Sequence, residues 1–88
     1  MYAKEVLIQN ETGFHIRPAQ IFVDAANKFE SDIKVVKEDK EVAGKSILGL
    51  MTMGAVKGMT ITIKAEGNDE MEAVNELVNL IENKFFEE

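Results

Sequence analysis

The 88-residue chain is predicted to fold as one α+β domain of two layers, with the element order β-α-β-β-α-β-α. Residues 60–65 alternate strictly between polar and apolar side chains, which is the period of a strand. Residues 16–29 and 69–85 instead carry apolar side chains at helical spacing. Two helices of this length can cover one face of a sheet, while the other face stays partly in water.

In the first half of the chain we expect a strand, a polar break and a helix. The strand spans residues 2–8 and ends in an apolar run, and the polar stretch 10–13 terminates it. The helix is expected over 16–29, with Pro18 in its first turn, where the missing N–H costs nothing. Its apolar stripe comprises Ile21, Phe22, Ala25, Ala26 and Phe29.

The second half is predicted to contain a hairpin, a short helix, a strand and a long helix. The hairpin pairs 32–37 with 41–43 across a turn at 38–40, and Ser46 caps a short helix over 47–51. Strand 60–65 follows, and Asp69 and Glu72 have the spacing of a capping box for the last helix. Glu87 and Glu88 are expected to be a frayed tail. The apolar stripe of that helix comprises Met71, Val74, Leu77, Val78, Ile81 and Phe85.

Composition and charge exclude several functions. The net charge of −6 argues against nucleic acid as a partner, and the acidity is concentrated in residues 66–88, since residues 1–65 sum to +1. The absence of cysteine excludes disulfides, thiolate metal sites and a cysteine nucleophile. No apolar run is long enough for membrane insertion, and the N-terminus lacks the layout of a signal peptide, so we expect a cytoplasmic protein.

The only histidine, the only arginine and the only proline fall within four residues, as His15, Arg17 and Pro18. An imidazole offers a neutral nitrogen nucleophile, and a guanidinium suits bidentate contact with phosphate. His15 precedes the predicted helix, whose start presents unsatisfied N–H groups and the positive end of the dipole. Gly13 permits an unusual backbone conformation just before it. The pattern is consistent with phosphoryl chemistry at His15, although a lone histidine at a helix start is more often a cap or a surface residue.

Other catalytic arrangements have little support. A single histidine without cysteine excludes Cys/His and zinc-finger sites, and we expect no metal and no cofactor. A Ser/His/Asp triad stays open, although no nucleophile-elbow pattern is present. Gly44-Lys45-Ser46 matches only the end of a P-loop, because the preceding glycine at the required spacing is absent.

Two motifs in register resemble the HPr family, the histidine-containing phosphocarriers of the bacterial phosphoenolpyruvate:sugar phosphotransferase system. Residues 12–19, TGFHIRPA, are similar to the active-site motif of that family, and residues 45–51, KSILGLM, to its regulatory serine segment. Gly54, Lys57-Gly58, strand 60–65 and the acidic last helix also match. The resemblance covers residues 1–88 as a single domain. It implies an open-faced β-sandwich, in which a four-stranded antiparallel sheet carries three helices on one face.

The resemblance also implies a function. His15 would take a phosphoryl group on Nδ1 from Enzyme I and pass it to a IIA domain of a sugar permease, as a stoichiometric carrier rather than a catalyst. Arg17 would stabilise the phosphoryl group and Pro18 would fix the helix start. A monomer is expected. Residues implied in partner binding are Ile47, Leu48, Met51, Gln20 and Thr12.

An alternative is a regulatory binding module of a different class. The resemblance implies that an HPr kinase/phosphorylase would phosphorylate Ser46, and that this form would bind a catabolite control protein as corepressor. His15 would then have little or no carrier activity, although the two roles can coexist. A plain α+β interaction domain without phosphate chemistry is the third alternative, and the two motifs in register argue against it.

The sequence departs from the family pattern at three places. Ile16 stands where alanine is usual, Gln20 where a smaller residue is usual, and Glu38-Asp39-Lys40 where a glycine is frequent. Ile16 adds bulk beside the phosphate site and bears on transfer rate and partner choice. The presence of His15 argues against the regulatory paralogue Crh, which keeps the serine but lacks the histidine.

Overall fold

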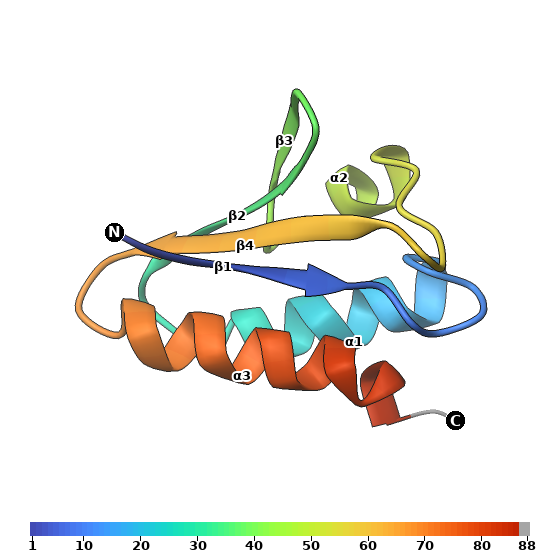
Figure 1. The fold of residues 1–88 in the computed structure, drawn as a ribbon. Helices are drawn as coiled ribbons and strands as arrows, with labels where there is room; N and C mark the ends of the chain where they lie inside the picture. Colours follow the sequence, from blue (N-terminus) through green and yellow to red (C-terminus); the bar gives the residue numbers. More distant parts are fainter. Residues whose placement is uncertain (87–88) are drawn as a thin grey trace.

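Four antiparallel strands form one sheet in the order β1-β4-β2-β3, as the computed structural model of residues 1–86 shows (Figure 1). The strands are β1 (Tyr2–Leu7), β2 (Asp32–Lys37), β3 (Lys40–Ala43) and β4 (Thr60–Glu66). The register places Val6 of β1 and Val35 of β2 next to the buried isoleucines of β4, opposite Ile61 and Ile63 respectively. One face of the sheet is therefore apolar, while the alternate positions of β4 are polar and partly exposed.

Three helices complete the domain. α1 (Ile16–Ala26) and α3 (Glu70–Glu82) lie along the apolar face of the sheet, and α2 (Ile47–Thr52) packs against α1 and beside β3 (Figure 1). A short turn, η1 (Lys84–Phe86), follows α3 and has positive φ at all three residues. The fold class predicted from the sequence is confirmed. The largest fully buried side chains are Phe22, Phe85, Ile8, Ile33, Leu50, Met53, Ile61, Ile63, Leu77, Ile81, Val35 and Val74.

Two boundaries differ from the predicted ones. α1 ends at Ala26 rather than Phe29, because the chain tightens into i→i+3 hydrogen bonds from Lys28 N and Phe29 N. Lys45 Nζ donates to Phe29 O at 2.8 Å and holds that carbonyl outside the helix. The β2–β3 turn has two residues rather than three, with Glu38 at φ +55°, and Lys40 already pairs with Lys37.

The predicted capping box at the start of α3 is wrong. Asp69 is the N-cap residue, but its carboxylate makes no capping hydrogen bond. It accepts instead from the backbone N–H groups of Glu30 (2.9 Å) and Ser31 (3.0 Å) and from the Ser31 hydroxyl. Met71, predicted to lie in the apolar stripe of α3, is exposed, and the buried face of the helix includes Ala73 and Leu80 instead. We call the Ser31–Asp69 contacts the distal clamp, because these residues precede β2 and α3, which both begin at the end of the sheet opposite the start of α1 (Figure 1).

Glu87 and Glu88, expected to be a frayed tail, lie outside the described residues. Within residues 1–86 no helix has the length and apolar character needed to cross a membrane.

Replacing Asp69 with asparagine is expected to reduce the loss of stability in acid. The hydrogen bonds from the Ser31 side chain and from the Glu30 backbone hold the pKa of Asp69 below its ordinary value. A carboxylate with a lowered folded-state pKa stabilises the fold above its unfolded pKa, which is about 3.9, and this contribution is lost as pH falls through the folded value. Urea unfolding midpoints between about pH 5 and pH 2 should therefore fall less steeply for Asp69→Asn than for wild type.

The control for this comparison is Asp39→Asn, an exposed carboxylate in the β2–β3 turn. Its midpoints should follow the wild-type slope. Equal slopes for Asp69→Asn and wild type would contradict the role assigned to the distal clamp.

Candidate active site

The candidate active site lies at the start of α1, where His15 is the N-cap residue. Its backbone is extended (φ −79°, ψ −177°), and its carbonyl accepts the first helical hydrogen bond, from Ala19 N at 2.9 Å. The side chain makes no capping hydrogen bond and is exposed. Pro18 is buried in the first turn, as predicted, and needs no acceptor there. An exposed imidazole therefore stands beside a helix end whose first N–H groups have no acceptor within the helix.

Gly13 fixes the backbone conformation of the loop that precedes His15. Its φ is +60°, a left-handed value that glycine adopts without a steric cost. A Cβ at this position would lie 2.3 Å from Ala55 O and 2.8 Å from the Cα of Val56. The loop before α1 thus lies directly against the loop between α2 and β4, and a side chain at position 13 would separate them.

The buried side chain of Phe14 anchors the loop before His15 to the hydrophobic core. Its N–H donates to Ala55 O at 3.2 Å, and the residue is 4% exposed. The ring meets Phe22 of α1 edge to face, with 5.4 Å between the centroids, and Phe85 after α3 at 5.7 Å. Edge-to-face pairs of this kind are favourable beyond the area they bury. The residue immediately before His15 is consequently fixed by α1, by the turn η1 after α3 and by the loop before β4.

An ion pair also links the two loops beneath the site. Lys57 Nζ lies 2.8 Å from Glu11 Oε1. This hydrogen bond and the charge of Lys57 hold the pKa of Glu11 below its ordinary value. Both side chains are more than half exposed, so the pair adds little stability and is screened by salt.

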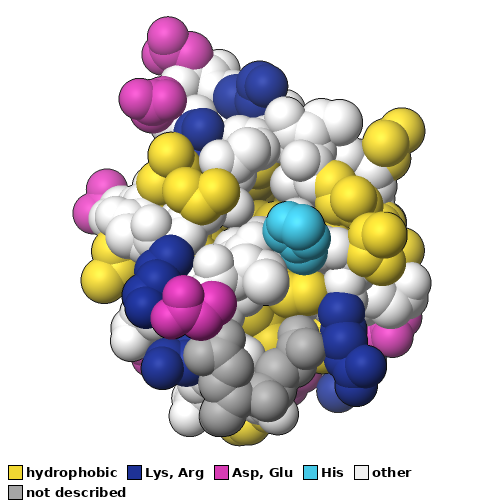
Figure 2. All heavy atoms as spheres, turned by 90° about the vertical axis from the view of Figure 1, so that its right-hand side faces the viewer, with side chains coloured by type: hydrophobic (Ala, Val, Ile, Leu, Met, Phe, Trp, Pro, Cys, Tyr) yellow, Lys and Arg dark blue, Asp and Glu magenta, His cyan; other side chains and the backbone are white. Residues whose placement is uncertain are grey.

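The face that carries the histidine combines apolar and basic side chains. Figure 2 shows the sole histidine near the middle of this face, with hydrophobic side chains to either side and Lys or Arg side chains below it. Exposed large hydrophobic residues of the neighbouring segments are Ile16 (67%), Leu48 (74%), Met51 (38%) and Val56 (48%). Exposed apolar groups around a reactive side chain are typical of a protein-binding surface.

Ser46 is the N-cap residue of α2, as predicted. Its Oγ accepts a hydrogen bond from Gly49 N at 3.0 Å, and its backbone is extended. The side chain is partly exposed. In the segment that follows, Leu50 is fully buried, Ile47 is half-buried, and Leu48 and Met51 are exposed. α2 therefore presents two of its three predicted partner-binding residues to solvent.

The remaining predicted site residues are exposed. Gln20 donates from Nε2 to Asp24 Oδ1 at 2.9 Å, along the solvent side of α1. The Oγ1 atom of Thr12 accepts from Asn10 Nδ2 at 3.3 Å. Arg17 lies in the first turn of α1, beside His15 in sequence. α1 packs against α2, and the start of α2 lies near the C-terminal end of α1, where Lys45 Nζ donates to Phe29 O.

Sequence reasoning missed Asn10 and the segment at Ala55 and Val56. The composition of residues 10–13 predicts only a break after β1, yet Asn10 is 2% exposed and donates to Gly13 O at 2.9 Å. An asparagine three residues before a glycine is a recognisable turn signal, because its side chain can hydrogen-bond the backbone a few residues on. No local signal identifies Ala55, since its contact with Gly13 spans more than forty positions of the chain.

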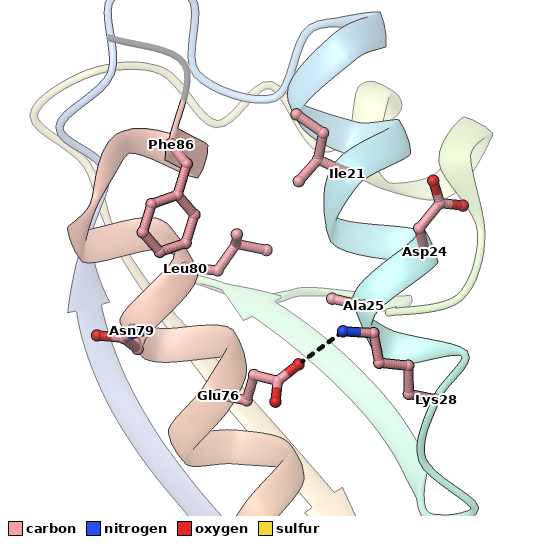
Figure 3. A pocket seen from close by; sticks show the side chains of 8 residues that line it. All are labelled: Ile21, Asp24, Ala25, Lys28, Glu76, Asn79, Leu80 and Phe86. Atoms are coloured by element: carbon pink, nitrogen blue, oxygen red, sulfur yellow. Dashed lines mark hydrogen bonds and ion pairs between the residues drawn. The ribbon is translucent and has the colours of Figure 1, made fainter.

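A groove of about 490 Å³ lies elsewhere, between α1 and α3. The Lys28–Glu76 ion pair, at 3.4 Å, crosses it, and Phe86 lies over its other end (Figure 3). None of the predicted site residues lines this groove; its walls are Ile21, Asp24, Ala25, Lys28, Glu76, Asn79, Leu80 and Phe86. Among residues 1–86, no three acidic or histidine side chains come together as metal ligands. The groove is thus separate from the predicted site at the start of α1.

Comparisons with known proteins agree on one family. Residues 2–83 match the PTS-HPr model, described as the PTS HPr component phosphorylation site. The phosphocarrier protein HPr of Vibrio cholerae is 46% identical over 82 residues, which are 93% of this chain and 96% of that protein. The HPr-like protein Crh of Halalkalibacterium halodurans is 45% identical over 84 residues, 96% of this chain and all of that protein.

Solved structures agree with these relatives. HPr-C-His from Thermoanaerobacter tengcongensis has a TM-score of 0.96 and 49% identity, covering 100% of this chain and 99% of that one. An HPr dimer from the same organism has a TM-score of 0.77 and 48% identity, covering 97% and 98% of the two chains.

Replacing Gly13 with alanine is expected to lower the free energy of unfolding by about 2–4 kcal/mol. The left-handed backbone costs a non-glycine residue about 1–2 kcal/mol, and the contact with Ala55 adds a displacement of packed backbone. Denaturant unfolding gives the loss directly. Gly58→Ala is the matched control, because Gly58 also has positive φ (+93°) but a Cβ there would meet no atom within 4 Å. Equal losses for the two variants would show that the close approach contributes nothing.

Proposed function

The chain belongs to the HPr family, the phosphocarriers of the phosphotransferase system, and from this premise we propose that it carries a phosphoryl group on His15. The donor would be phosphorylated Enzyme I and the acceptor a IIA domain of a sugar permease. The observation that carries the proposal is the exposed imidazole of His15 at the N-cap of α1, with no capping hydrogen bond of its own. The protein would act in the cytoplasm as a stoichiometric carrier, changed by each transfer and restored by the next.

In each transfer one bond to phosphorus forms as another breaks. The lone pair of His15 Nδ1 attacks the phosphorus of the donor, and the bond between phosphorus and the donor atom breaks with its electron pair returning to the donor. In transfer to a IIA domain, the acceptor group of that domain attacks the phosphorus, and the bond between phosphorus and His15 Nδ1 breaks with its electron pair returning to the imidazole. No oxidant, reductant or metal ion enters this balance.

The start of α1 supplies the favourable environment for the phosphoryl group. The first N–H groups and the positive end of the helix dipole favour a dianion placed beside the N-cap. We assign Arg17 a charge-assisted contact to the same group, worth about 1.5–3 kcal/mol where it is shielded from water. Pro18 is buried and holds the backbone of the first turn at a helical φ. The start of α1 is therefore already ordered before a phosphoryl group arrives.

The exposed apolar residues around His15 would form the binding surface for Enzyme I and IIA. Leu48 and Met51 from α2 and Ile16 from α1 provide apolar area at the candidate site. Thr12, Gln20 and the half-buried Ile47 remain part of the proposed surface. Ile16 is the bulkiest departure from the family pattern, and its exposure supports a role in partner choice. The monomeric state stays a prediction, since an HPr relative forms a dimer.

A second function is favoured by the geometry of Ser46. Its hydroxyl is partly exposed and accepts the N-cap hydrogen bond of α2 from Gly49 N. A phosphate there would add about −2 of charge beside Leu48 and Met51. We propose that HPr kinase/phosphorylase makes this modification, that it weakens transfer from Enzyme I, and that it creates a binding site for a catabolite control protein.

Incubation with Enzyme I and phosphoenolpyruvate is expected to label the protein with one phosphoryl group that is labile in acid and stable in base. This stability pattern is that of a phosphoramidate on histidine. His15→Ala should carry no label, and Ser46→Ala should be labelled as wild type. Arg17→Ala should be labelled about 10- to 100-fold more slowly, since a charge-assisted hydrogen bond is lost. The absence of label on wild type, or an undiminished label on His15→Ala, would contradict the proposal.

HPr kinase/phosphorylase with ATP is expected to give an acid-stable phosphoserine on wild type and on His15→Ala, but not on Ser46→Ala. The last variant should also lose about 1 kcal/mol of stability, because Gly49 N loses its capping acceptor. Binding of the catabolite control protein is measured with phosphorylated wild type and with Ser46→Ala. If both bind equally well, the regulatory role of Ser46 fails.

A further inference from the structure

Asn10 is a buried polar residue in the loop that leads to His15. Only Asn10 and Ser31 are buried polar residues among those described, with exposures of 2% and 1%. Ser31 belongs to the distal clamp and is bonded to Asp69. Asn10 lies in the loop between β1 and α1, where side chains normally face water. Its burial therefore needs an explanation specific to this loop.

The side chain of Asn10 closes the turn formed by residues 10–13. Its Nδ2 donates to Gly13 O at 2.9 Å and to Thr12 Oγ1 at 3.3 Å. The backbone closes the same turn from the other side, because Gly13 N donates to Asn10 O at 3.3 Å. Both polar groups of Gly13 are thus bonded to Asn10, and these two hydrogen bonds hold Gly13 in its left-handed conformation.

The other end of Asn10 has no partner. Its Oδ1 is buried and accepts no hydrogen bond from any residue in the described part of the chain. A buried acceptor without a donor is destabilising, and an apolar residue would avoid that cost. The buried amide places two N–H donors on the turn, which an apolar residue could not do. A buried polar side chain in a loop calls for a specific role, and these contacts point to the turn.

The turn is connected to His15 through rigid contacts. Before it, Ile8 exchanges hydrogen bonds with Met59 O (2.8 Å) and Gly58 N (2.9 Å), which anchors the start of the loop. After it, the Phe14 N–H is bonded to Ala55 O, and the Phe14 ring is buried. Between these anchors, Asn10 is the buried hydrogen-bonding side chain of residues 10–13, whereas the Glu11–Lys57 pair is exposed.

We propose that Asn10 is a positioning residue for phosphoryl transfer: its buried amide holds the turn 10–13 and thereby aims the imidazole of His15. This inference rests on the proposed function of His15 as the phosphoryl carrier. Asn10 acts through Gly13 and Phe14 and does not contact the phosphoryl group. Without the amide, the partner-binding surface remains but the imidazole occupies its attacking orientation for less of the time.

The test compares Asn10→Ala with wild type in transfer from phosphorylated Enzyme I, at a temperature where circular dichroism shows both proteins folded. We expect kcat to fall about 10-fold or more with KM nearly unchanged, because misplacement of a reacting group lowers the rate without removing the binding surface. Ser31→Ala is the matched control: it removes a hydrogen bond of the other buried polar residue, at the far end of the sheet. It should lower stability but leave kcat and KM unchanged.

Thr12→Val is a second variant that removes only one of the two acceptors of Asn10 Nδ2. Because Thr12 also belongs to the proposed partner-binding surface, its readout is hydrogen exchange at Gly13 and His15 rather than kcat. Faster exchange at both amides is expected, and this result decides the question if Asn10→Ala does not fold. A kcat equal to wild type in the folded Asn10→Ala variant, or a loss matched by Ser31→Ala at equal stability, would overturn the inference. So would a change confined to KM.

Backbone NMR separates this inference from the proposed function. If Asn10 positions the loop, Asn10→Ala should shift the amide signals of Gly13, Phe14 and His15 and speed their hydrogen exchange, with the sheet unaffected. This readout does not require Enzyme I. Absence of transfer in wild type would refute the carrier function alone, while unchanged Gly13 and His15 signals in Asn10→Ala would refute the positioning role alone.

Discussion

The burial of Phe14 is the constraint on which the reactive end of this molecule depends. Its ring packs edge to face against Phe22 of α1 and Phe85 of η1, so it joins the start of α1 to the turn that follows α3. The next residue, His15, is exposed to a partner. A carrier needs its reactive group to be exposed and yet fixed in direction. Here the exposed His15 directly follows the buried Phe14, so no flexible segment lies between the reactive side chain and the core.

The same contact explains why two distant segments form one surface. Ala55, whose carbonyl receives the Phe14 N–H, follows α2 by only a few residues. The hydrogen bond from Phe14 N therefore fixes the chain after α2 against the loop that precedes His15. α2 itself packs against α1. Ser46 caps α2, the helix that leads into the segment at Ala55. The carrier and regulatory roles proposed for His15 and Ser46 thus involve two segments that are linked through the Phe14–Ala55 hydrogen bond.

Most of the fold followed from local patterns in the sequence. The strict alternation of 60–65 and the placement of Pro18 and Ser46 identified β4 and the starts of α1 and α2, since each of these signals acts within a few residues. The failures were non-local. Asp69 has the spacing of a capping box, but Ser31 and Glu30, nearly forty positions earlier, take its carboxylate. Residues 10–13 have the composition of a solvated loop, and only the packed structure shows that Asn10 is buried there.

The polar face of the sheet has a consequence for the divergence of this family. No helix covers it among the described residues, and the side chains of Thr62, Lys34 and Lys64 on that face are only partly buried. Substitutions at such positions disturb little packing, whereas changes beneath α1 and α3 disturb the whole core. The covered face therefore limits which sequences can retain the fold, whereas substitutions on the open face can change the surface charge with little effect on packing.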